Sequence, residues 1–139
     1  MTGVPGIFAC GNVLHVHDLV DFVTEEARRC GERAAAYLGG RWGRSGEAAA
    51  ATTPAGQLKV VPGANVRYVV PNACAPDREN VLFLRAMVVK NNGVLDVKSD
   101  GTSILTRKLA HVQPSEMIRL ALPASPALAS ASGIEVSIR

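Results

Sequence analysis

The chain has 139 residues, of which 47% are hydrophobic and 19% charged, and its formal net charge is +3. This composition argues against a disordered chain, and the length suffices for one domain of ordinary size. No apolar stretch approaches the ~20 residues that span a bilayer, and the N-terminus lacks the layout of a signal peptide, so we expect a cytoplasmic protein without a membrane contact. Residues 1–40 hold three arginines against five carboxylates, and the positive charges of the remainder form no cluster, which argues against nucleic-acid binding.

Residues 2–38 predict a short strand, a glycine turn and one long helix. Residues 7–10 are an apolar run without polar alternation, as expected for a strand covered on both faces. Gly11 would let the backbone come close to an object at the end of this strand, because it has no Cβ. The polar residue Asn12 follows Gly11, so the sequence predicts a polar side chain where the strand ends and the backbone comes close to another group.

The helix should begin at Asp18 or Leu19, with Asp18 as the N-cap and Asp21 in the positive first turn. Glycines 39 and 40 should end it. Gly31 costs about 1 kcal/mol relative to Ala inside a helix, which suggests close packing against a neighbour. Apolar positions spaced by three and four predict one buried stripe, made of Val20, Val23, Ala27, Cys30, Ala34 and Tyr37 or Leu38.

The remaining chain predicts a linker and a small β domain. Residues 41–57 are rich in small residues without periodicity and read as a linker, in which Trp42 would dock onto a neighbouring surface. Residues 58–139 alternate like strands, with hairpin signals at 91–93 and 99–101. Seven candidate strands suggest an antiparallel β-sandwich of immunoglobulin-like shape: 58–61, 65–70, 80–90, 94–98, 103–111, 116–122 and 133–138.

The segment TGVPGIFACGN resembles the second flavin-binding motif of the FAD-dependent pyridine nucleotide-disulfide oxidoreductases, the thioredoxin-reductase-like group. The matched residues are Thr2, Pro5, Gly6, Ile7, Phe8, Ala9 and Gly11, and the resemblance extends to about Leu38. Asn12 stands where the family has Asp. An amide can still donate to and accept from a hydroxyl group.

The resemblance implies that residues 1–40 are the C-terminal segment of an FAD-binding α/β domain, so the chain as a whole would be α+β. It implies cofactor-binding roles for Gly11 and Asn12 at the ribityl chain of FAD. It also implies that the helix start, Asp18, Leu19 and Val20, faces the pyrimidine edge of the flavin, with NAD(P)H as the hydride donor. No residue of this chain is implied as catalytic.

The sequence carries no G-x-G-x-x-G fingerprint for a dinucleotide. A partner chain or a missing N-terminal region would therefore have to supply the FAD and NAD(P) folds, and this chain is not expected to be catalytic alone. Two alternatives stay open. The chain could be a non-catalytic accessory or assembly subunit, or an inactive truncated product that self-associates through residues 1–40.

Several other residues could carry chemistry. His15 and His17 could hold a metal, but without a third ligand in the nearby sequence we expect surface or capping histidines and no metal site. Cys10 and Cys30 read as buried, inert thiols, whereas Cys74 in a loop should be exposed. Arg85 interrupts an apolar strand and is expected at a sheet edge or at an interface.

Overall fold

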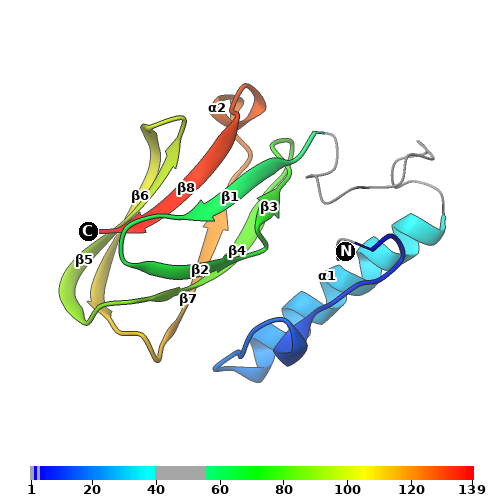
Figure 1. The fold of residues 1–139 in the computed structure, drawn as a ribbon, viewed down its shortest axis with the longest axis horizontal. Helices are drawn as coiled ribbons and strands as arrows, with labels where there is room; N and C mark the ends of the chain where they lie inside the picture. Colours follow the sequence, from blue (N-terminus) through cyan, green and yellow to red (C-terminus); the bar gives the residue numbers. More distant parts are fainter. Residues whose placement is uncertain (1, 3, 40–55) are drawn as a thin grey trace. The chain divides into compact units, whose positions relative to one another are not determined.

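The computed structural model describes residues 2, 4–39 and 56–139 (Figure 1). The chain divides into two compact units, residues 1–52 and 53–139. We call the described residues of the first the helical unit and those of the second the β unit. Most of the expected linker, residues 41–55 with Trp42, lies outside the described residues, and so does Gly40 at the expected helix end.

The helical unit contains a 3-10 turn, η1 (Gly11–Val13), and the long helix α1 (Val20–Leu38). The predicted helix is thus confirmed, but its expected N-cap is wrong. Leu19 occupies the N-cap position with an extended backbone (φ −123°, ψ 137°), and no side chain caps the helix there. Asp18 lies one residue too early to reach the first-turn N–H groups from the N-cap position.

Residues 7–10 form no strand within the described part of the chain, which corrects the expectation of a buried strand. An extended segment needs a neighbouring strand to pair its backbone, and the helical unit holds none among its described residues. The segment instead runs back along α1. Near the C-terminal end of α1, the ring of Phe8 packs edge-on against Tyr37 with centroids 5.9 Å apart. Nearer the N-terminal end of α1, Gly11 contacts Glu26.

The face of α1 that meets this segment differs from the predicted stripe. Cys30 and Tyr37 are half-buried, as expected, but Val20 and Ala27 are exposed and Glu26 is buried. Gly31 is also exposed, and a Cβ added there would meet nothing within 4 Å, so close packing does not explain this glycine. The buried face therefore centres on a carboxylate.

The β unit consists of eight strands and a short helix. They are β1 (Leu58–Pro62), β2 (Val66–Val70), β3 (Ala73–Cys74), β4 (Asn80–Ala86), β5 (Lys90–Ser99), β6 (Thr102–Val112), β7 (Met117–Leu122), α2 (Pro126–Ala129) and β8 (Gly133–Ile138). One sheet has the order β3-β1-β8-β5-β6 and the other β2-β4-β7. All pairings are antiparallel except that of β1 with β8. The expectation of a mostly antiparallel β domain is confirmed.

Both sheets contribute to one hydrophobic core. Leu82 and Leu84 of β4 and Leu95 of β5 have no exposed surface. Leu128 of α2 is fully buried as well, and the Ser125 hydroxyl caps this short helix by accepting a hydrogen bond from the Ala127 N–H at 3.1 Å. The alternating pattern of the sequence thus places apolar side chains on the inner faces of the two sheets.

The two hairpin signals have different outcomes. Asp100 and Gly101 have φ of 47° and 84° and join β5 to β6, as predicted. The turn expected at 91–93 is wrong, because these residues lie inside β5. Gly93 pairs with Leu109, and an added Cβ would come within 3.1 Å of Val112.

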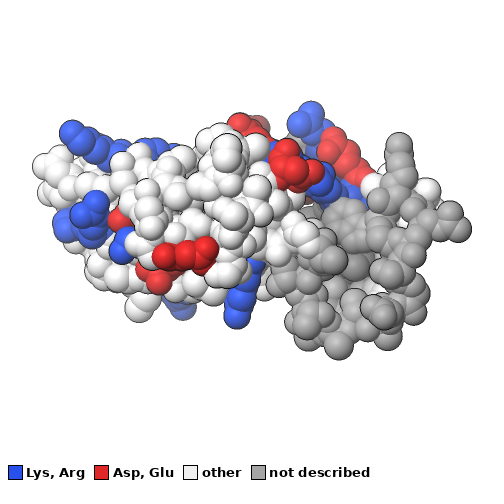
Figure 2. All heavy atoms as spheres, turned by 90° about the horizontal axis from the view of Figure 1, so that it is seen from above, with Lys and Arg blue, Asp and Glu red and all other residues white. Residues whose placement is uncertain are grey.

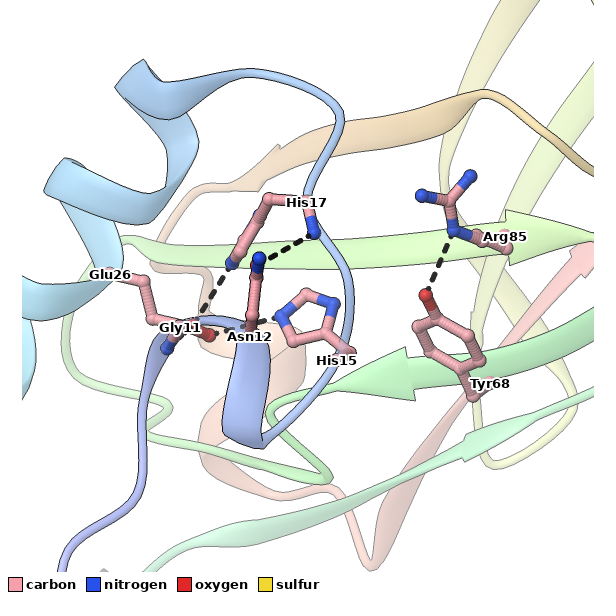
Figure 3. A network of polar contacts seen from close by, with 7 residues as sticks. All are labelled: Gly11, Asn12, His15, His17, Glu26, Tyr68 and Arg85. Atoms are coloured by element: carbon pink, nitrogen blue, oxygen red, sulfur yellow. Dashed lines mark hydrogen bonds and ion pairs between the residues drawn. The ribbon is translucent and has the colours of Figure 1, made fainter.

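The expectation of an exposed Cys74 is wrong, and so is the sheet-edge alternative for Arg85. Cys74 is 2% exposed, because β3 pairs with β1 and is covered by the core. Arg85 lies on β4, the central strand of its sheet, where its guanidinium donates to the Tyr68 hydroxyl at 3.1 Å (Figure 3). It also donates to the Ser115 carbonyl at 2.6 Å. On the face seen in Figure 2, Lys and Arg side chains lie in separate places among Asp and Glu.

Candidate functional site

The chain turns back onto α1 at Gly11, the first residue of η1. Gly11 has φ of +68°, and its carbonyl accepts hydrogen bonds from the N–H groups of Leu14 at 2.9 Å and His15 at 3.3 Å. Its own N–H donates to Oε2 of Glu26 at 2.6 Å. A glycine therefore makes the tight reversal, because other residues rarely adopt this backbone conformation.

The reversal brings two histidines to the carboxylate of Glu26. Nε2 of His15 lies 3.2 Å from Oε1 and Nε2 of His17 lies 3.0 Å from Oε2. The two rings lie side by side with centroids 4.2 Å apart. Figure 3 shows both imidazoles directed at Glu26. We call His15, His17 and Glu26 the His-Glu cluster.

The cluster is buried: each of its three residues is 8% exposed. Burial raises the pKa of Glu26, but hydrogen bonds from His17, the Gly11 N–H and His15 act in the opposite direction, and the net result is a pKa below the ordinary value. An ionised carboxylate only accepts hydrogen bonds, so both Nε2 atoms act as donors in this arrangement. The charge of Glu26 is thus compensated by three N–H groups.

This geometry corrects the expectation for the histidines. Neither is a surface or capping residue, and the third possible ligand that the nearby sequence lacked is supplied by the helix. A signal was present in the sequence. Glu26 follows Val23 by three residues and precedes Cys30 by four, so it is in phase with the apolar face of α1.

The residues expected to contact FAD lie in different environments. Gly11 is buried beneath the loop, whereas Asn12, Asp18, Leu19 and Val20 are exposed. Leu19 and Val20 are 54% and 76% exposed and form the start of α1. The positive end of the helix dipole is therefore accessible at this point.

Asn12 connects the two halves of the loop. Its Oδ1 accepts a hydrogen bond from the His17 N–H at 3.3 Å. The amide nitrogen makes no hydrogen bond within the described residues and can donate to a further group. Asn12 is thus held by the same loop that carries the histidines.

Cys10 and Cys30 lie next to each other in the helical unit. Both are half-buried rather than fully buried. A hydrogen bond between the two thiols, together with burial and the nearby charge of Glu26, raises the pKa of Cys10. The thiol form is therefore favoured at Cys10, consistent with the expected low reactivity.

Comparisons of the chain with protein-family models, with curated proteins and with solved structures found no match. Among the described residues, no helix combines the length and apolar character needed to cross a bilayer. The case for a function therefore depends on the motif and on the geometry of the helical unit.

Proposed function

We propose that the helical unit closes the flavin site of an FAD-dependent NAD(P)H oxidoreductase of the cytoplasm. The nucleotide-binding folds would come from a partner chain or from another region of a longer protein. Bound FAD would accept hydride from NAD(P)H and pass electrons to an acceptor. This chain would contribute binding and orientation.

The observation that carries the proposal is that Asn12 and the first residues of α1, Leu19 and Val20, are all exposed. The Asn12 amide could donate to a ribityl hydroxyl while its oxygen stays bound to the His17 N–H. The N-cap residue, Leu19, makes no side-chain cap hydrogen bond, and the positive end of the helix dipole favours an electron-rich ring there. Both features support the proposed contact with the cofactor.

The apolar surface of the helical unit also supports the proposal. Eight of its large apolar side chains are at least 46% exposed: Val4, Ile7, Val13, Leu14, Val16, Leu19, Val20 and Leu38. These side chains leave apolar surface that another structure can cover. The remaining strands of a flavin-binding domain would cover it and would also pair the backbone of residues 7–10.

The same surface favours one alternative, self-association through residues 1–40 without a flavin. In a further alternative, the chain is an accessory subunit that binds a flavoprotein through the β unit. The three proposals differ in whether flavin, a second polypeptide, or only a second copy accompanies the chain.

The test is purification of the chain under native conditions from the cells that make it, followed by size-exclusion chromatography with detection of flavin absorbance. We expect FAD to elute with the chain and with the nucleotide-binding folds. Asn12→Asp introduces the family's acidic residue and should increase flavin retention, whereas Asn72→Asp, an exposed site in the β unit, should not.

A colourless homo-oligomer would overturn the flavin proposal in favour of self-association. A partner that retains FAD equally well with and without this chain would favour the accessory role. Either result would also predict no effect of Asn12→Asp on flavin.

A further inference from the structure

We propose that the His-Glu cluster is a binding site for one divalent transition-metal ion of the zinc type. Its ligands would be Nε2 of His15, Nε2 of His17 and one carboxylate oxygen of Glu26. This inference is independent of the flavin proposal, because it rests on the interior of the helical unit rather than on its exposed face.

The distances within the cluster bring three ligand atoms close enough for one ion. The three atoms all lie within 4.8 Å of one another, with Nε2 of His15 3.2 Å from Oε1 of Glu26 and Nε2 of His17 3.0 Å from Oε2. Tetrahedral Zn²⁺ with bonds of about 2.0–2.1 Å separates its ligand atoms by about 3.3 Å. Binding would therefore require only small side-chain movements.

The chemistry of the ligands selects the class of ion. Two imidazole nitrogens and one carboxylate oxygen suit Zn²⁺ and its neighbours in the first transition row, whereas Mg²⁺ and Ca²⁺ prefer oxygen alone. Three protein ligands leave a fourth position of a tetrahedral ion for water or another small ligand.

The metal would replace protons. Without it, each Nε2 donates its hydrogen to Glu26, since an ionised carboxylate only accepts. With it, each Nε2 presents a lone pair to the ion, so a neutral ring carries its proton on Nδ1 instead, and a doubly protonated ring releases its Nε2 proton to solvent. Glu26 then exchanges two hydrogen bonds for one metal bond.

Gly11 would support the site from outside the ligand set. Its N–H holds Oε2 of Glu26 at 2.6 Å and can remain there while Oε1 binds the ion. The ligands come from the loop and from α1, at separations of nine and eleven residues. A bound ion would therefore tie the loop to the helix, and its binding energy would stabilise the helical unit.

The test uses the full chain, treated with a chelator and then titrated with Zn²⁺ in a calorimeter. We expect one equivalent to bind. His15→Ala, His17→Ala and Glu26→Gln should each weaken binding by about 100-fold or more. His111→Ala is the matched control, because His111 is the third histidine of the chain and is exposed on β6, and it should leave the affinity unchanged.

A second measurement does not depend on the folding of a variant. Zn²⁺ added to the wild-type chain should shift the imidazole NMR resonances of His15 and His17 and leave those of His111 in place. The proposal is overturned if the chain binds no Zn²⁺, if His15 and His17 do not respond, or if Cys10→Ser and Cys30→Ser abolish binding while Glu26→Gln does not.

Discussion

The N–H of Gly11 donates a hydrogen bond of 2.6 Å to a carboxylate oxygen of Glu26, fifteen residues further along the chain. Gly11 has φ of +68°, a conformation that favours glycine. The bond joins the turn at Gly11 to the same carboxylate of α1 that the two histidines contact.

Replacing Gly11 with Ala should lower the stability of the helical unit by about 1 kcal/mol, because φ of +68° is unfavourable for an L residue. An added Cβ would meet only Val23 at an ordinary 3.6 Å, so the cost comes from the backbone. Thermal unfolding followed by the helical circular-dichroism signal measures it.

Gly31→Ala is the matched substitution and should have the opposite sign. Gly31 lies inside α1 with open space around it, so Ala should stabilise the helix by up to about 1 kcal/mol. Equal losses in Gly11→Ala and Gly31→Ala would contradict the assigned backbone conformation.

Replacing Glu26 with Ala should destabilise the helical unit by about 1–3 kcal/mol, since it removes the acceptor of three buried N–H groups. Glu32→Ala is the control. Glu32 is exposed, and its Oε1 lies 3.9 Å from Nε of Arg28. Loss of this surface ion pair should lower the stability by less than about 0.5 kcal/mol. The same circular-dichroism signal distinguishes the two, and similar effects would mean that the cluster is not buried in solution.

Asp100 should make the stability of the β unit depend on pH in the acid range. Hydrogen bonds from the Ser132 hydroxyl and from the Ser132 N–H lower the pKa of Asp100 below its ordinary value of 3.8. The stabilisation is therefore present above pH 3.8 and is lost as pH falls through the lower, folded-state pKa. Denaturant unfolding at a series of acid pH values should show this loss in wild type and not in Asp100→Asn.

Ser132→Ala provides the matched check on Asp100. It removes the hydroxyl donor and keeps the backbone donor, so the acid dependence should become smaller without vanishing. An unchanged dependence in Asp100→Asn would show that other carboxylates cause it.

Ionisation of Cys74 should lower the stability of the β unit at alkaline pH. Burial raises the pKa of Cys74 from 9.0 to about 11, because the thiolate is disfavoured beneath the sheet. The unfolded chain then releases its proton first, so stability is intact below pH 9 and falls as pH rises toward 11, by at most about 3 kcal/mol.

Cys74→Ala should flatten this part of the pH profile relative to wild type, as measured by denaturant unfolding at alkaline pH. Cys30→Ala lies in the other unit and should leave the unfolding of the β unit unchanged. Parallel profiles for wild type and Cys74→Ala would contradict the burial of the thiol.

The fold of the β unit could be predicted where the residue types themselves determine the backbone conformation. Asp100 and Gly101 both tolerate positive φ, and the hairpin forms there. The signal at 91–93 failed because the chain already leaves the sheet at residues 87–89, between β4 and β5, where exposed Met87 and Val89 continue the apolar alternation. Alternation alone does not reveal when a chain crosses from one sheet to the other.

The His-Glu cluster was only half predictable. His15 and His17 are conspicuous in the sequence, but their partner is a residue that charge assigns to the solvent-facing side of α1. Its burial follows from the turn at Gly11, which brings the loop over that face. The flavin contacts at Asn12 and the helix start remain predictions.

The parallel pairing of β1 with β8 has a consequence for synthesis on the ribosome. Lys59 pairs with Gly133 and Pro62 with Val136, so almost the entire β unit has to be translated before β1 meets β8. The contacts of Glu26 with Gly11, His15 and His17 span at most fifteen residues, so these can form early in the nascent chain. A truncation before β8 would leave β1 and β5 with facing open edges, and such a product should aggregate.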